Sequence, residues 1–185
     1  TYEREILRLL SRLLRAGDAC IDVGANIGIF SARAAHLVGC GGAVVAVEPS
    51  PRCQADLDLV VEGMANVMVL RAALGPTTGV VQLSGWDNPD HRGLGTVVTG
   101  HRAGLVENWF DGQSIEVPQL RLADVIAEHT GDREIGLLKI DVEGYEPEVL
   151  AGAPGLFADG LVRTAILEVT PDVDALWAAD LIASA

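Results

Sequence analysis

Apolar residues at helical spacing open this chain, and short continuous apolar runs follow them. In residues 1–16, arginines alternate with a stripe of apolar residues, a pattern that predicts an amphipathic helix ending at Gly17. Apolar runs typical of buried strands follow at 19–23, 43–48 and 67–70. Helices are predicted between these runs, over 29–38 and from Pro51 to Gly63. This alternation predicts an α/β fold with a doubly wound, mostly parallel sheet.

The regular alternation lapses between residues 72 and 113 and then returns. Turn-forming residues are dense over 85–95, so 85–113 is predicted as a long, substrate-facing loop. Further strands are predicted at 80–83, 114–117, 135–141 and 161–169, and helices at 122–129, before Gly152 and after Pro171. We expect a leading helix over 1–16 and one domain over 17–185.

Charge and composition exclude several classes of partner. The chain has 185 residues, with 26 acidic against 13 basic residues and a net charge of −13, which would repel nucleic acid. No apolar run is long enough for a membrane span, so we expect a cytoplasmic protein, with membrane contact by the basic first helix as the alternative. The cysteines are predicted to be buried free thiols, and a homo-oligomer stays possible.

The turn after the first strand carries the strongest chemical signal. Residues 20–30 read as a strand, a turn with Gly24 and Gly28, and the start of a helix. Glycines there let a ligand approach the backbone, and helix amides point at it, as in nucleotide-cofactor loops. Glu48 ends the second strand, at the same sheet edge, where a carboxylate can accept hydrogen bonds from both ribose hydroxyls. An ordinary turn and a solvated surface glutamate are the alternatives.

Four motifs together resemble one enzyme family. They are Asp22-Val23-Gly24-Ala25-Asn26-Ile27-Gly28, Glu48-Pro49, Ala73-Leu74-Gly75 and Lys139-Ile140-Asp141-Val142-Glu143-Gly144. In this order, the motifs are similar to those of the FkbM family of S-adenosylmethionine-dependent methyltransferases. The resemblance implies a Rossmann-like class I methyltransferase fold, with S-adenosylmethionine as cofactor and a hydroxyl of a small molecule, natural product or sugar as methyl acceptor.

The resemblance also assigns cofactor-binding residues. Gly24, Asn26 and Gly28 would face the methionine part, Glu48 the ribose, and the turn at Ala73 the adenine, with Asp22, Pro49 and Asp141 also at the site. Family members continue beyond the fifth parallel strand with a sixth and a seventh. The sequence shows no counterpart of these strands, so we expect either a fragment or a sheet that lacks its last hairpin.

Candidates for catalysis follow from the need to remove the acceptor proton. Asp141 ends a strand beside the first, so it is the leading candidate base, with Glu143 next to it and His101 of the long loop as the rival. A purely structural Asp141 is an open alternative. Asp141 and Glu143 could ligate Mg²⁺, but we expect no metal, since strand-end acids usually bond to backbone amides.

Two other functions compete with methyl transfer. A nicotinamide-dependent dehydrogenase would also need a glycine turn and an acid after the second strand, but it expects Gly-x-Gly-x-x-Gly, and position 26 is Asn. A non-catalytic protein that keeps the fold is the second alternative.

Overall fold

A parallel five-stranded sheet forms the centre of the chain. The computed structural model describes residues 2–84, 96–97 and 114–169. Neighbouring strands of the main sheet are all parallel, in the order β3-β2-β1-β8-β9. Their bounds are β1 Ala19–Val23, β2 Ala43–Val47, β3 Val67–Leu70, β8 Ile135–Ile140 and β9 Ala165–Leu167. The strand order reverses at β1, with β2 and β3 on one side and β8 and β9 on the other, which confirms the doubly wound fold predicted from the sequence.

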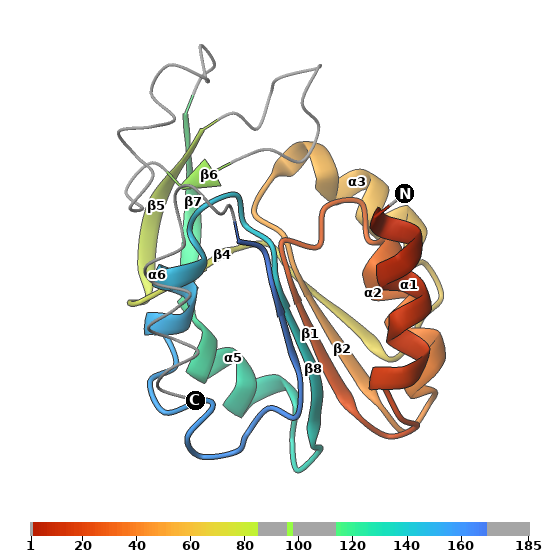
Figure 1. Cartoon of the computed structure of the whole chain (residues 1–185). Helices are drawn as coiled ribbons and strands as arrows, with labels where there is room; N and C mark the ends of the chain where they lie inside the picture. The colour runs from red at the N-terminus through yellow and green to blue at the C-terminus, as the bar shows by residue number, and fades with distance from the viewer. Residues whose placement is uncertain (1, 85–95, 98–113, 170–185) are drawn as a thin grey trace.

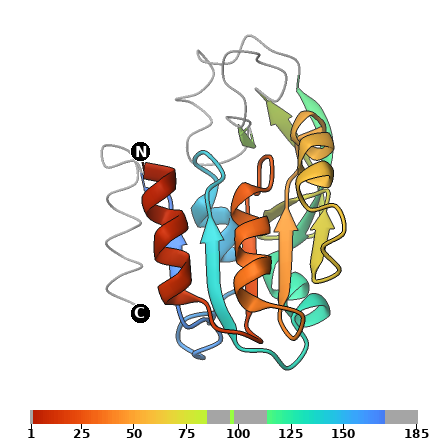
Figure 2. The ribbon, with the colours of Figure 1, turned by 90° about the vertical axis from the view of Figure 1, so that its right-hand side faces the viewer.

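Helices cover both faces of this sheet (Figures 1 and 2). One face packs against α1 (Tyr2–Leu13), α2 (Ile29–Val38) and α3 (Pro51–Val60). The other face packs against α5 (Leu122–His129) and α6 (Glu146–Ala151). Side chains alternate between the faces as strand geometry requires, so Cys20 faces the first group of helices and Ile21 faces the second. Because both faces are buried, the strands read as continuous apolar runs.

A second, four-stranded sheet packs against the same core as α5 and α6. Its order is β4-β7-β5-β6, with bounds β4 Ala73–Gly75, β5 Gly79–Ser84, β6 Thr96–Val97 and β7 Ile115–Arg121. Leu74, Leu83 and Val117 contribute buried side chains to the core shared with the main sheet. The sequence predicted two of these strands but not the sheet, because β4 and β6 are too short to show a period.

Several predicted boundaries are confirmed and others are wrong. The strands at 19–23 and 67–70 and the helices at 29–38 and 122–129 have the predicted bounds. The strand predicted at 161–169 is only Ala165–Leu167, and it is preceded by an isolated parallel bridge between Val162 and Ile135. The strand predicted at 114–117 continues to Arg121. Most of the predicted substrate loop and the final helix lie outside the described residues.

Two further expectations can be checked in the fold. Cys20 and Cys53 are buried free thiols, but Cys40 is exposed because it lies in the glycine-rich turn after α2, so the prediction was wrong for that residue. None of the helices in the described ranges has the length and hydropathy that a membrane crossing requires.

Candidate functional site

A cavity of about 440 Å³ opens at the carboxyl ends of β1, β2 and β8. This is the edge of a parallel α/β sheet where ligands bind, and the volume lies in the range of small-molecule sites. Residues proposed from the sequence line this cavity, and they are Gly24, Asn26, Glu48, Pro49, Ala73, Asp141 and Glu143. Residues from separate segments of the chain therefore meet at one site.

The turn after β1 is held open by residues with left-handed backbone angles. Gly24 has φ +78° and Asn26 has φ +50°, while Gly28, at φ +83°, precedes the first residue of α2. The amides of Gly24 and Ala25 both donate to the carbonyl of Val47, each at 3.0 Å, which ties the turn to β2. This geometry explains the two glycines, since left-handed angles strain most other residues.

Glu48 is part of the wall between the first two turns. Its side chain is buried, Oε2 accepts from the Asn26 amide and Oε1 accepts from the Ser50 amide, both at 2.8 Å. Burial raises the pKa of Glu48, although the two amide hydrogen bonds oppose that shift. The solvated surface glutamate considered from the sequence is therefore wrong, and the carboxylate joins two turns while facing the cavity.

Asp22 and Gly28 are in the predicted motif but do not line the cavity. Asp22 is fully buried on the face of β1 covered by α2, and Ser31 donates to its Oδ2 at 2.6 Å. A Cβ atom on Gly28 would overlap Cδ1 of Leu57, so no ligand is needed to explain this glycine. Both residues shape the turn from behind.

The turn after β8 is stabilised by a buried carboxylate whose role was not predicted from the sequence. Glu146 is fully buried, and its Oε1 accepts from the amides of Val142 and Gly144 at 3.0 and 3.2 Å. Glu143, between them, has φ +56°, so the turn presents this residue in a strained backbone conformation. An acid three residues after Glu143, at the start of a helix, is the sequence signal that could have indicated this role.

Comparison with known proteins assigns the family. Residues 22–179 match the family model described as the Methyltransferase FkbM domain. The chain belongs to the FkbM methyltransferase family. This membership confirms the resemblance expected from the sequence, and with it S-adenosylmethionine as the cofactor. It gives no support to the dehydrogenase considered above.

Two relatives place this FkbM domain among known proteins. The 31-O-demethyl-FK506 methyltransferase FkbM of Streptomyces tacrolimicus is 36% identical over 159 residues, covering 75% of this chain and 60% of that protein. Methyltransferase sdnD of Sordaria araneosa is 29% identical over 185 residues, covering 84% of this chain and 70% of that protein. The chain therefore spans 60% of the length of the first relative.

Two solved structures are more distant. An rRNA methylase of Clostridium thermocellum aligns with 38% of this chain and 39% of its own at 18% identity and a TM-score of 0.36. Fibrillarin of Aeropyrum pernix, in complex with S-adenosylmethionine, aligns with 38% of this chain and 32% of its own at 24% identity and a TM-score of 0.33.

The FkbM domain has polar atoms suited to S-adenosylmethionine. Asn26 Oδ1 is buried, and no residue in the described ranges bonds to it, although Asn26 lines the cavity. A buried acceptor of this kind is satisfied by a donor such as the ammonium of the cofactor's methionine part. Glu48 and Ala73, which the resemblance expects at the ribose and the adenine, both line the cavity. When bound, the cofactor supplies an activated methyl group.

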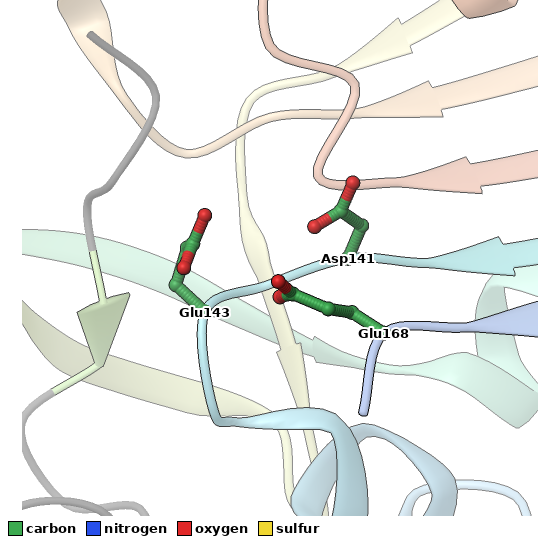
Figure 3. A group of neighbouring side chains, drawn as sticks. All are labelled: Asp141, Glu143 and Glu168. Carbon is green, nitrogen blue, oxygen red and sulfur yellow. The ribbon is translucent and has the colours of Figure 1, made fainter. Parts of the chain in front are cut away.

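Three acids gather at the same cavity. Asp141, Glu143 and Glu168 come from the ends of β8 and β9, and one oxygen from each lies within 4.8 Å of the others (Figure 3). Carboxylates at this spacing are of the type that holds Mg²⁺. Glu168 lies in the strand predicted at 161–169 and was not predicted as a site residue. The rival base, His101, lies outside the described residues.

Lys139 is the other residue of the site whose role was not predicted from the sequence. It lines the cavity with an almost fully buried side chain, and its ammonium lies 3.3 Å from Asp22 Oδ1 and 3.1 Å from Asp141 Oδ2. Burial lowers the pKa of Lys139, but the two carboxylates outweigh burial and leave it raised. The side chain therefore carries a positive charge at neutral pH. A lysine inside an apolar strand is the sequence signal for such a role.

Proposed function

We propose that this FkbM domain transfers the methyl group of S-adenosylmethionine to a hydroxyl oxygen of a small molecule, such as a natural product or a sugar. The observation that carries the proposal is the position of Asp141, whose half-exposed carboxylate lines the cofactor cavity beside Glu143. The name of the Streptomyces tacrolimicus relative, a 31-O-demethyl-FK506 methyltransferase, supports oxygen as the acceptor atom.

The chemistry requires little beyond positioning and a base. The acceptor oxygen attacks the methyl carbon, so an oxygen–carbon bond forms while the carbon–sulfur bond breaks and its electron pair stays on sulfur. The hydroxyl proton passes to the Asp141 carboxylate. A base within hydrogen-bond reach of the acceptor accelerates such a step by about 10² to 10⁴. The cavity walls hold the two reactants together, which supplies much of the remaining rate.

The acidic rim favours the same class of substrate. Asp141, Glu143 and Glu168 give this side of the cavity a negative field, which disfavours phosphorylated or carboxylated acceptors. A neutral hydroxylated molecule meets no such repulsion. This supports a neutral small molecule as acceptor over nucleic acid, in agreement with the net charge of −13.

A mass-spectrometric screen tests the proposal. The protein is incubated with S-adenosylmethionine carrying a trideuterated methyl group and with matched panels of neutral alcohols, amines and carboxylic acids. We expect a gain of one labelled methyl group on a hydroxylated compound, in a product that resists mild alkaline hydrolysis as an ether does. Methylation confined to amines, or to carboxylates as alkali-labile esters, would contradict oxygen transfer to a hydroxyl.

A further inference from the structure

Lys139 occupies an unusual position in the main sheet. It lies directly opposite Asp22 in the parallel pairing of β1 with β8, and both side chains lie on the sheet face covered by α2. The neighbouring positions on that face, Cys20 and Leu137, are apolar and fully buried. A buried ion pair is seldom more stabilising than well-packed apolar residues, so stability alone gives little reason for this charge.

The ammonium of Lys139 connects the buried Asp22 to two groups at the cavity wall, the carbonyl of Gly24 and the carboxylate of Asp141. It lies 3.2 Å from the carbonyl oxygen of Gly24, and it forms the ion pairs with Asp22 and Asp141 described above. The ring of Phe30 lies beneath it, with the ring centroid 5.6 Å from Nζ. Asp22 is itself fixed by Ser31 at the start of α2. The ammonium therefore has one hydrogen-bond acceptor, the Gly24 carbonyl, and two ion-pair partners, which together restrict where the side chain can lie.

We propose that Lys139 is a positioning residue of the methyl-donor site, which fixes the Gly24 carbonyl and the Asp141 carboxylate relative to each other. The inference rests on the cofactor being S-adenosylmethionine, whose methionine part the turn at Gly24 is expected to hold. The lysine also sets the local charge. The charge of Lys139 offsets one of the two carboxylates beside it. The site can therefore attract the cationic sulfonium and still bind the neutral product.

The test measures the affinity of S-adenosylmethionine and of its neutral product, S-adenosylhomocysteine, by titration calorimetry. Lys139→Met removes the charge but keeps the length of the side chain. Arg163→Met is the matched control, because Arg163 also pairs with a buried aspartate, Asp18. This residue directly precedes β1, at the end of the strand away from the cavity. We expect Lys139→Met to bind S-adenosylhomocysteine at least tenfold more weakly than the parent, and Arg163→Met to bind it within twofold.

The ratio of the two affinities separates positioning at the site from a general loss of structure. Without Lys139, the half-exposed Asp141 carboxylate loses its cation, which favours the cationic sulfonium, so the preference for S-adenosylmethionine over S-adenosylhomocysteine should rise about threefold or more. Lys139→Arg, which keeps the charge, should keep the parental preference. Weaker binding in Lys139→Met with an unchanged preference would assign a structural role and overturn the proposal.

A double variant covers the case in which Lys139→Met does not fold. Asp22→Asn combined with Lys139→Met removes the buried carboxylate that has lost its cation, so this protein should fold, bind S-adenosylhomocysteine weakly and show the same raised preference as Lys139→Met. If a folded variant that lacks Lys139 binds S-adenosylhomocysteine with the affinity of the parent, the role of Lys139 is overturned but the cofactor assignment is not. A parent protein that binds neither ligand would overturn the cofactor assignment and the proposal together.

Discussion

Gly24 packs directly against the main chain of Asp141. A Cβ atom on Gly24 would overlap the carbonyl oxygen of Asp141, far inside contact distance. The turn after β1 and the turn after β8 therefore touch through backbone atoms. This contact, and not a ligand, is the first reason why residue 24 has no side chain.

Gly24→Ala should consequently destabilise the fold itself. Gly63→Ala is the matched control, because Gly63 has nearly the same angle, φ +77° against +78°, with nothing within 4 Å of the added carbon. We expect a loss of about 1 to 2 kcal/mol in the control, from the left-handed angle alone, and of about 3 kcal/mol or more in Gly24→Ala. Denaturant unfolding measures both values. Equal losses would show that the contact with Asp141 is unimportant.

Asp141→Asn tests the base. The asparagine oxygen still accepts from Lys139, so cofactor affinity should stay within a few-fold of the parent, while methyl transfer should slow by about 10² or more. Single-turnover kinetics on an acceptor found in the screen measures the rate. Glu143→Gln, Glu168→Gln and His101→Asn are the comparisons. Transfer at the parental rate in Asp141→Asn, with a slow rate in one of these, would move the proton acceptor to that residue.

Stability should depend on pH through Glu48. Its pKa is raised in the folded state by burial. Between the ordinary glutamate pKa, about 4.3, and the raised folded value, the folded state binds more protons than the unfolded state, so the unfolding free energy falls as pH rises. Glu48→Gln should reduce this decline to the part that comes from Asp22, whose pKa burial also raises, and the exposed Glu62→Gln should keep it. Urea unfolding across the acidic to neutral range gives the slopes, and equal slopes for Glu48→Gln and the parent would contradict the burial effect.

The fold was largely predictable because its signals are local. Continuous apolar runs such as Ala43–Val47 indicate strands buried on both faces, and a glycine such as Gly152 marks where a helix ends, although α1 ends at Leu13, before the predicted Gly17. The second sheet was not predictable, because β4 is very short and its pairing with β7 joins positions far apart along the chain. Such pairing depends on tertiary packing and leaves no periodic pattern.

The site was predictable to the level of its cavity wall. Glu48 and Asp141 end apolar runs, and strand ends meet at one edge, so their convergence follows from topology. The supports behind the wall were missed, because Lys139 and Glu146 look like surface charges until the sheet register buries Lys139 and the start of α6 buries Glu146. Asp22 was predicted beside the cofactor. Neighbouring residues of a strand face opposite sides of the sheet, so Val23 faces α5 and α6 while Asp22 faces α2.

Glu48 on the ribose of S-adenosylmethionine is the contact on which the assignment of this cavity depends most. Titration calorimetry with S-adenosylhomocysteine and with its 2′,3′-dideoxy analogue tests it in the parent protein, in Glu48→Gln and in the control Glu62→Gln. We expect Glu48→Gln to bind S-adenosylhomocysteine about 1.5 to 3 kcal/mol more weakly than the parent does. The dideoxy analogue should bind to Glu48→Gln and to the parent with equal affinity. Unchanged affinity in Glu48→Gln, or equal losses on removing the hydroxyls in both the parent and Glu48→Gln, would contradict this contact.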